Sequence, residues 1–317
     1  MSLRKGEHVL IITDRETLEV GEAISEAAGR VSKGNVKLFV LEDYTYRPAK
    51  ELPKEIFEAI PWANITFYAA KSLPGELAMR GPLIRTAIKY ARHGHMPSIT
   101  KKLMETGMCA DYGKISHLTK NVERVVKTSR NCRVTNRAGT NLTVEFNPTW
   151  RWRVSDGLYP QKGMWGNLPD GEIYTAAYEA NGKMVIDELG DWFSPKYGVL
   201  EATPLSLEVK DSRIDLSSIT CKNEQLQREF LDYVKSDPNG DRLGEFAIGT
   251  NIFLDRLTGN LLQDEKIPSV HCAFGDPYPD ETGADWHAKT HVDGIMLKCN
   301  IWMDDKQIMI EGKHLID

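Results

Sequence analysis

Five side chains of the types that bind divalent metals lie in the C-terminal half of the chain, each within a short apolar segment. His291 and Asp293 are separated by one residue, so on a β-strand they would point to the same face. His271 lies in an apolar run, and Glu172 and Glu245 each follow a glycine at the start of a strand-like segment. A buried carboxylate is costly unless it is paired or bound to a metal. The set therefore predicts a site for hard or borderline cations.

Each of these residues also has an ordinary explanation when it is taken alone. A single His-x-Asp pair arises by chance, His271 is compatible with a hydrogen-bonded core histidine, and each glutamate is compatible with an edge strand. Together, two Glu, two His and one Asp suit Zn, Mn, Co or Fe(II), and they are numerous enough for two ions that share a carboxylate. A second histidine pair, His93 and His95, lies in a segment expected to be a loop and is the weaker candidate.

Composition excludes several classes of protein. The chain has 317 residues, of which 41% are apolar and 27% charged, and its formal net charge is −5. A soft prior of about 150 residues per domain gives two domains. The chain lacks the excess of basic residues that would indicate a nucleic-acid partner. No apolar run approaches the roughly 18 residues of a membrane span. The five cysteines lack CxxC spacing, which favours reduced thiols in a cytoplasmic protein.

The N-terminal part alternates strand and helix signals. The pattern predicts strands at 9–13, 36–41 and 65–69, and helices at 17–31, 51–59, 82–91 and 99–104. This alternation favours an open α/β domain with a mostly parallel sheet, over residues 1–135. No glycine-rich phosphate-binding motif follows the first strand, so the sequence gives no specific support for a nucleotide site.

The C-terminal part reads as β-rich. The pattern predicts two strands around a turn within 132–146, a strand at 205–211, a helix at 223–235 and a hairpin at 301–310. With the metal-binding candidates it forms the expected second domain, a β-rich catalytic metal-binding domain over residues 136–317.

Several ordered motifs carry a family resemblance. They are Asn-Leu-Pro-Asp-Gly-Glu-Ile-Tyr-Thr-Ala at 167–176, Leu-Gly-Glu-Phe-Ala at 243–247, Asp-Glu at 264–265, His-Cys-Ala-Phe-Gly at 271–275 with Tyr278 and Pro279, and His-Val-Asp at 291–293. In order and approximate spacing they resemble the thermophilic metallo-aminopeptidases of the aminopeptidase T and aminopeptidase S type. The N-terminal half is compatible with that family's α/β domain but carries no diagnostic motif.

The resemblance implies an enzyme that removes N-terminal residues from peptides at a dinuclear metal centre. It implies that the ligands of two divalent ions (Zn, Co or Mn) are Glu172, Glu245, His271, His291 and Asp293. Tyr278 matches a tyrosine beside the metals that could donate a hydrogen bond to an oxyanion, and Glu172 or Glu245 could accept a proton from water. A homodimer is the expected assembly.

Departures from the family pattern concern the surroundings of the ligands. Ala177 stands where the family usually has proline, and Lys266 begins a run that differs from the Asn-containing run of the peptidases. The segment before His291 also differs, and it makes Trp286, His287 and Lys289 candidates for a substrate pocket, with a solvated loop as the alternative. The substrate is therefore either a small peptide or another small molecule.

The tail at 291–306 carries a second resemblance, to the 2,5-dihydroxypyridine dioxygenases. This resemblance implies a mononuclear Fe(II) site that cleaves an aromatic ring, for which two histidines and one carboxylate are suitable ligands. Both Gly-Glu motifs are retained although a single iron does not require them, which favours the hydrolase. A non-catalytic metal-binding protein is a third class, and the intact ligand set with Tyr278 argues against it.

Overall fold

A computed structural model describes residues 1–316 and divides the chain into two compact units. The first comprises Met1–Tyr112 and the returning segment Gly157–Asp170, and the second comprises Gly113–Asp156 and the described chain from Gly171 onward. The expected domain boundary after residue 135 falls within the second unit, in the turn between two paired strands. That boundary therefore differs from the limits of the compact units.

The first unit is built around one parallel sheet of strand order β2-β1-β3-β4-β8. Its strands are β1 (Val9–Thr13), β2 (Val36–Val40), β3 (Ile65–Ala69), β4 (Arg92–His95) and β8 (Trp165–Asn167). Its helices are α1 (Leu18–Ser32), α2 (Lys54–Ala59), α3 (Leu77–Tyr90) and α4 (Lys101–Glu105). The three strands and four helices predicted for this region are confirmed, with shifts at their ends.

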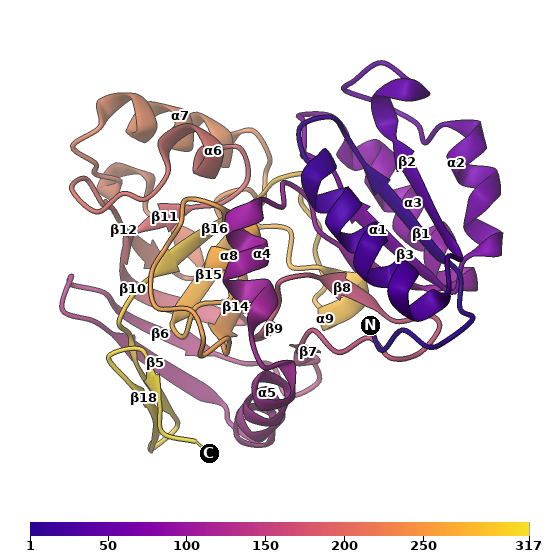
Figure 1. The fold of residues 1–317 in the computed structure, drawn as a ribbon. Coiled ribbons are helices and arrows are strands. Elements are labelled where there is room, and N and C mark those ends of the chain that lie inside the picture. The colour runs from indigo at the N-terminus through magenta and orange to yellow at the C-terminus, as the bar shows by residue number, and fades with distance from the viewer. Residues whose placement is uncertain (317) are drawn as a thin grey trace. The chain divides into compact units, whose positions relative to one another are not determined.

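Helices cover both faces of this sheet, as Figure 1 shows for α1, α2 and α3. Along β1, Leu10 and Ile12 belong to an apolar core shared with α2 and α3, whereas Val9 and Ile11 belong to a core shared with α1. Successive side chains of a strand point to opposite faces, and a strand buried on both faces reads as a continuous apolar run. This is why the short run at 9–12 is wholly apolar.

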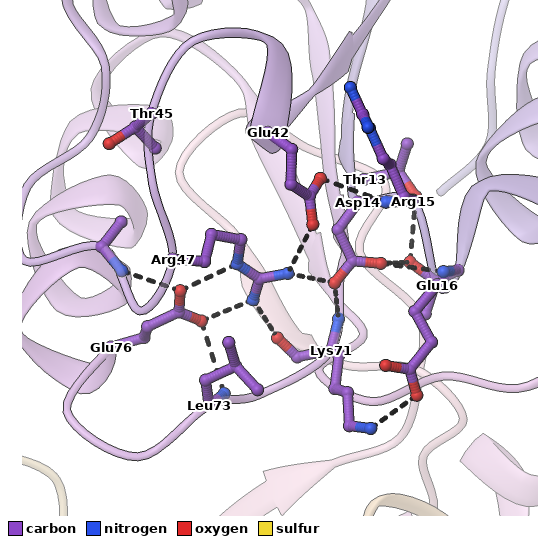
Figure 2. A network of polar contacts seen from close by, with 12 residues as sticks. Thr13, Asp14, Arg15, Glu16, Glu42, Thr45, Arg47, Lys71, Leu73 and Glu76 are labelled. Atoms are coloured by element: carbon purple, nitrogen blue, oxygen red, sulfur yellow. Dashed lines mark hydrogen bonds and ion pairs between the residues drawn. The ribbon is translucent and has the colours of Figure 1, made fainter.

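A buried polar network lies where β1 and β3 end (Figure 2). Arg47 donates from Nε and Nη2 to the two carboxylate oxygens of Glu76, at 2.8 and 2.6 Å, and its Nη1 contacts Asp14. Asp14 also accepts hydrogen bonds from the backbone of Thr17 at 2.8 Å and of Lys71 at 2.7 Å. The side chains of Arg47, Asp14 and Glu76 are at most 6% exposed, so one buried guanidinium and several backbone N–H groups hold two buried carboxylates.

The second unit contains two antiparallel sheets, with five helices assigned to it or crossing into it. The larger sheet has the order β13-β12-β10-β6-β5-β17-β18-β19, and the smaller has the order β11-β16-β15-β14-β9-β7. The strands are β5 (Asn131–Thr135), β6 (Asn141–Glu145), β7 (Arg153–Ser155), β9 (Glu172–Thr175), β10 (Glu179–Ile186), β11 (Glu188–Leu189), β12 (Leu205–Lys210), β13 (Arg213–Ile214), β14 (Leu243–Gly249), β15 (Val270–Gly275), β16 (His291–Met296), β17 (Asn300–Met303), β18 (Lys306–Ile310) and β19 (Lys313–His314). The helices are α5 (Tyr112–Val126), α6 (Phe193–Tyr197), α7 (Glu224–Lys235), α8 (Leu261–Asp264) and α9 (Pro279–Thr282).

One apolar core joins the inner faces of these two sheets. It contains Val134 and Leu142 from the larger sheet, and Phe246, Cys272 and Val292 from the smaller sheet. Strands of the smaller sheet therefore direct alternate residues into this core and the intervening residues to the opposite, outer face. The β-rich character and the two hairpins predicted for this part of the chain are confirmed.

Two elements differ from the sequence prediction or escaped it. His93 and His95 are not in a loop but in β4, which lies between β3 and β8 in the sheet, and both side chains are buried. The prediction was wrong because Arg-His-Gly-His lacks the apolar pattern of a strand, and only pairing with β3 and β8 defines it. Helix α5 was not predicted, although its buried face repeats at helical spacing. Among residues 1–316, no helix is long and apolar enough to cross a membrane.

Candidate metal centre

The five candidate ligands come from four neighbouring strands of the smaller sheet, in the order β16-β15-β14-β9. Along β14, Phe246 and Ile248 point into the core, so Glu245 points to the outer face. The same alternation places His271 of β15 on the outer face, opposite in direction to Cys272. His291 and Asp293 flank Val292, and Glu172 precedes core residue Ile173. All five side chains therefore share the outer face of one sheet.

Small residues on this face leave room between the candidate ligands. Ala273 pairs with Glu245 on one side and with Asp293 on the other, so an alanine separates the two carboxylates across the strands. Ala247 pairs with His271 on the adjacent strand. Because side chains directly opposite each other in a sheet are neighbours, methyl groups at these positions allow the longer ligands to lean toward a common point.

The ligand atoms converge closely. Glu245 Oε1 lies 3.5 Å from His271 Nε2, and Glu245 Oε2 lies 3.6 Å from His291 Nε2. His291 Nε2 is 3.6 Å from Asp293 Oδ1, and Glu172 Oε2 is 3.4 Å from His271 Nε2. Glu245 is thus central, with one oxygen toward each histidine. The sequence prediction that these residues gather is matched by the geometry.

Three residues of this cluster are grouped closely enough to hold a metal ion. One ligand atom from each of Glu245, His271 and Asp293 lies within 4.8 Å of the others, and all three residues are buried. Their nitrogen and carboxylate oxygens are donors that Zn, Mn, Co and Fe(II) accept. His291 Nδ1 lies 2.8 Å from the carbonyl oxygen of Asp276, an arrangement that fixes the ring and directs Nε2 toward the cluster.

The electrostatics of the cluster favour a bound cation. Burial alone would lower the pKa of His271, but its hydrogen bond to Glu245 and the charge of Glu172 raise that pKa to about 9. For His291, the charge of Asp293 outweighs burial and raises the pKa to about 10. Burial would raise the pKa of Asp293, and the charge of His291 lowers it to about 2. The carboxylates therefore attract positive charge onto the histidines, and a divalent ion can supply that charge in place of protons.

Lys266 is a member of this cluster that the sequence analysis did not place in the site. Its Nζ lies 2.5 Å from Glu172 Oε1 and 2.7 Å from Glu265 Oε1. The Lys266 side chain is 1% exposed, and burial raises the pKa of Glu265. The only sequence signal was its position directly after Asp264 and Glu265, and such a lysine cannot be told from a surface lysine without the tertiary contacts.

Tyr278 lies beside the centre, as the resemblance implies. Its ring centroid is 4.5 Å from that of His291. The residue is 41% exposed, so solvent reaches its side chain. The backbone of Tyr278 is left-handed, with φ of 51°, immediately before α9. Tyr174 lies on the other side of Tyr278, with ring centroids 6.4 Å apart, and its hydroxyl donates to Glu281.

The three candidate substrate-pocket residues have different surroundings. Trp286 is buried in an aromatic cluster with Trp150, and the guanidinium of Arg242 lies 3.6 Å from its ring centroid. His287 and Lys289 are exposed on the same loop, and His287 Nδ1 is 3.7 Å from Asp276 Oδ2. Trp286 therefore packs against Trp150 and Arg242 in the folded structure. A substrate contact by any of the three residues stays a prediction.

Comparison with known proteins agrees with this geometry. A family model described as thermophilic metalloprotease (M29) matches residues 108–294, which is more than half of the chain. The chain belongs to this family, and the resemblance seen in its motifs is confirmed. Membership places it among metal-dependent hydrolases and accounts for the buried acidic and histidine cluster. No curated protein sequence matches the chain significantly.

Two solved structures share the fold across nearly the whole chain. The 2,5-dihydroxypyridine dioxygenase from Pseudomonas putida KT2440 aligns with a TM-score of 0.70 and 16% identity, covering 99% of this chain and 93% of its own. Wild-type AmpT from Thermus thermophilus aligns with a TM-score of 0.63 and 14% identity, covering 99% of this chain and 95% of its own. Both fold relationships expected from the motifs are thereby confirmed.

Proposed function

We propose that the chain is a metal-dependent aminopeptidase-type hydrolase that acts on small peptides. The observation that carries this proposal is the central position of Glu245, which directs its two oxygens toward His271 and His291 on the outer face of a buried sheet. The chain's membership in the metalloprotease family supports amide hydrolysis as the reaction.

Each residue has a distinct part in the proposed reaction. Glu245, His271, His291 and Asp293 hold the metal, which when bound supplies a Lewis acid and lowers the pKa of water. Glu172 accepts a proton from the attacking water. Tyr278, whose ring lies against His291, donates a hydrogen bond to the oxyanion that develops on the substrate carbonyl.

The predicted pair of metal ions depends on Glu172 and Glu245. Glu245 has the orientation that a bridging carboxylate requires, because its oxygens face different histidines. Glu172 would have to bind the second metal ion, and one of its oxygens is already paired with Lys266. The two-ion centre therefore stays a prediction, as do the homodimer and the cytoplasmic location.

The experiment that tests the proposed function is hydrolysis of a panel of aminoacyl p-nitroanilides and short peptides by protein reconstituted with Zn²⁺, Mn²⁺ or Co²⁺. Glu245→Gln should abolish hydrolysis while the circular-dichroism spectrum stays that of the folded protein. Glu208→Gln, on the exposed side of β12, is the matched control and should retain activity. Unchanged turnover in Glu245→Gln would exclude the proposed centre.

A ring-cleaving Fe(II) dioxygenase is the second candidate. The observation that favours it is that His271, His291 and Asp293 supply two imidazoles and one carboxylate, the donor set of a non-haem iron site with open positions. The test is oxygen uptake by the Fe(II)-loaded protein with a dihydroxypyridine. Hydrolysis of peptides under strict anaerobiosis, together with no oxygen uptake in the dihydroxypyridine assay, would favour the hydrolase.

A further inference from the structure

Among the contacts that the structure shows for residues 1–316, Lys266 is the one lysine or arginine whose side chain lies inside the cluster described above. Its ammonium group joins Glu172 and Glu265, at 2.5 and 2.7 Å. A buried ammonium is stable only where carboxylates surround it. Glu172 is therefore bound to a positive charge before any metal arrives.

The backbone around Lys266 is held tightly against β14. Asn251 donates its backbone N–H to the carbonyl oxygen of Lys266 at 3.0 Å, and Gly249 donates to Ser269 at 3.0 Å. A Cβ atom at Gly249 would lie 1.8 Å from the carbonyl oxygen of Ile267, so the two segments are in contact through backbone atoms. The base of the lysine side chain is thus fixed in position, and its head group is directed to Glu172.

The Lys266 ammonium takes the position that a cation bound by Glu172 would need. The other oxygen of Glu172 faces His271 at 3.4 Å, so these two residues define the second half of a dinuclear arrangement. A metal there would have to displace the ammonium or share a carboxylate with it at close range. Like charges within a few ångströms repel strongly where the surroundings are buried.

The charge of the cluster is compatible with this geometry. Four carboxylates gather here, those of Glu172, Glu245, Glu265 and Asp293. With one ammonium and one divalent ion the formal charge of the cluster is −1, and a second divalent ion beside the ammonium would change it to +1. The charge count alone therefore does not decide the number of ions; the position of the ammonium does.

We infer that Lys266 Nζ takes the place of a second metal ion, so that the centre binds a single divalent cation and Glu172 serves as an acid–base group rather than as a ligand. This inference rests on the proposed metal centre. It concerns the number of ions and the role of Glu172, and it leaves open which reaction the bound ion serves.

The first test measures bound metal in the wild-type protein. Reconstitution with Mn²⁺, followed by removal of loose metal and elemental analysis, should give one equivalent per chain. The electron paramagnetic resonance spectrum should be that of isolated Mn²⁺. Two tight equivalents with an exchange-coupled spectrum overturn the inference and leave the proposed hydrolysis standing. One equivalent without hydrolysis of any peptide overturns the proposed function and leaves the inference standing.

Two substitutions test the roles of the side chains. Glu172→Gln should still bind one equivalent of Mn²⁺ but lose activity on the order of 100-fold, because it removes a proton acceptor. Loss of metal together with activity would overturn the inference.

Lys266→Met should allow a second equivalent of Mn²⁺ to bind. A folded variant that still binds only one equivalent contradicts the inference that Lys266 excludes a second ion. Lys222→Met, an exposed lysine, is the control and should bind one equivalent. If Lys266→Met does not fold, the wild-type spectrum and Glu172→Gln decide.

Discussion

The two units bury charged side chains in different ways. In the first unit, Arg47 is forked onto Glu76 and contacts Asp14, and backbone N–H groups donate further hydrogen bonds to both carboxylates (Figure 2). In the second unit, Glu245 and Asp293 face histidines at 3.5 to 3.6 Å. Carboxylates outnumber the lysine or arginine in both clusters, but those of the first are held by one arginine and by backbone N–H groups, whereas Glu245 and Asp293 of the second face imidazoles. Carboxylates held by hydrogen bonds stabilise a fold, and carboxylates grouped with imidazoles offer ligands to a cation.

Buried histidines repeat the same contrast. In β4, His93 contacts Thr66, His95 contacts Arg80, and the two rings contact each other. Burial lowers the pKa of His93 to about 3. His271 and His291 are buried too, yet the carboxylates raise their pKa values to about 9 and 10. Burial of a histidine therefore does not indicate function by itself; the charge of its neighbours does.

The largest expected effect comes from removing the cation of the first cluster. Arg47→Met should lower the free energy of unfolding by about 3–5 kcal/mol, because it leaves Asp14 and Glu76 buried without their cation. Urea denaturation followed by circular dichroism measures the change. Arg15→Met is the control, since Arg15 is 70% exposed, and it should change stability by less than about 0.5 kcal/mol. An equal loss in both variants would contradict the contrast between the clusters.

The acidic cluster should respond to metal in the opposite direction. A free divalent ion at 100 times its dissociation constant should stabilise the wild-type protein by about 2.7 kcal/mol, since it binds only the folded chain. Thermal unfolding with Mn²⁺ and with chelator measures this gain. Asp293→Asn removes a candidate ligand and should lose most of the gain, whereas Arg47→Met, if folded, should keep it. Equal stabilisation of wild type and Asp293→Asn would place the metal elsewhere.

Acid should destabilise the protein through His93. Because burial lowers its folded-state pKa from 6.5 to about 3, the unfolded chain binds the proton first as pH falls. The contribution of the neutral, buried histidine to stability is full above pH 6.5. It is lost progressively as pH falls toward 3, and the loss is about 2 kcal/mol at pH 5. Urea denaturation at pH 8 and pH 5 should show this loss, and His93→Gln should reduce it. The same acid sensitivity in His93→Gln would exclude this histidine as the cause.

The smallest effect is expected at the rim of the cluster around Arg47. Lys71 Nζ contacts Glu16 at 2.6 Å, but the two side chains are 44% and 63% exposed. Water and salt screen such a pair, so Glu16→Gln should change the free energy of unfolding by less than about 1 kcal/mol. Denaturation at low and at high salt measures it. A larger loss would mean that the network extends to the surface.

Much of the scaffold was readable from local pattern. The apolar runs at 9–13 and 65–69, and the alternation at 205–210, are confirmed as strands because burial on one or both faces leaves a periodic signal in the sequence. The same logic placed His291 and Asp293 on one face of a strand. Helix ends were less well placed: α3 begins at Leu77, before the expected start at 82, because Pro82 lies inside the helix rather than at its first turn.

Other features required contacts between distant parts of the chain. Strand β4 is defined by pairing with β3 and β8, and its own residues give no strand signal. The packing of Trp286 against Trp150 and Arg242 likewise joins segments that are distant in the sequence. Neither outcome depends on spacing in the sequence.

By itself, the sequence determined which residues could bind a metal and that strands would carry them, since residue type and periodicity are local properties. The tertiary structure alone decided that Glu245 would stand between two histidines and that Lys266 would pair with Glu172 across 94 positions of the chain. Charge acts through space, so the balance of a buried cluster is set by which segments the fold brings together.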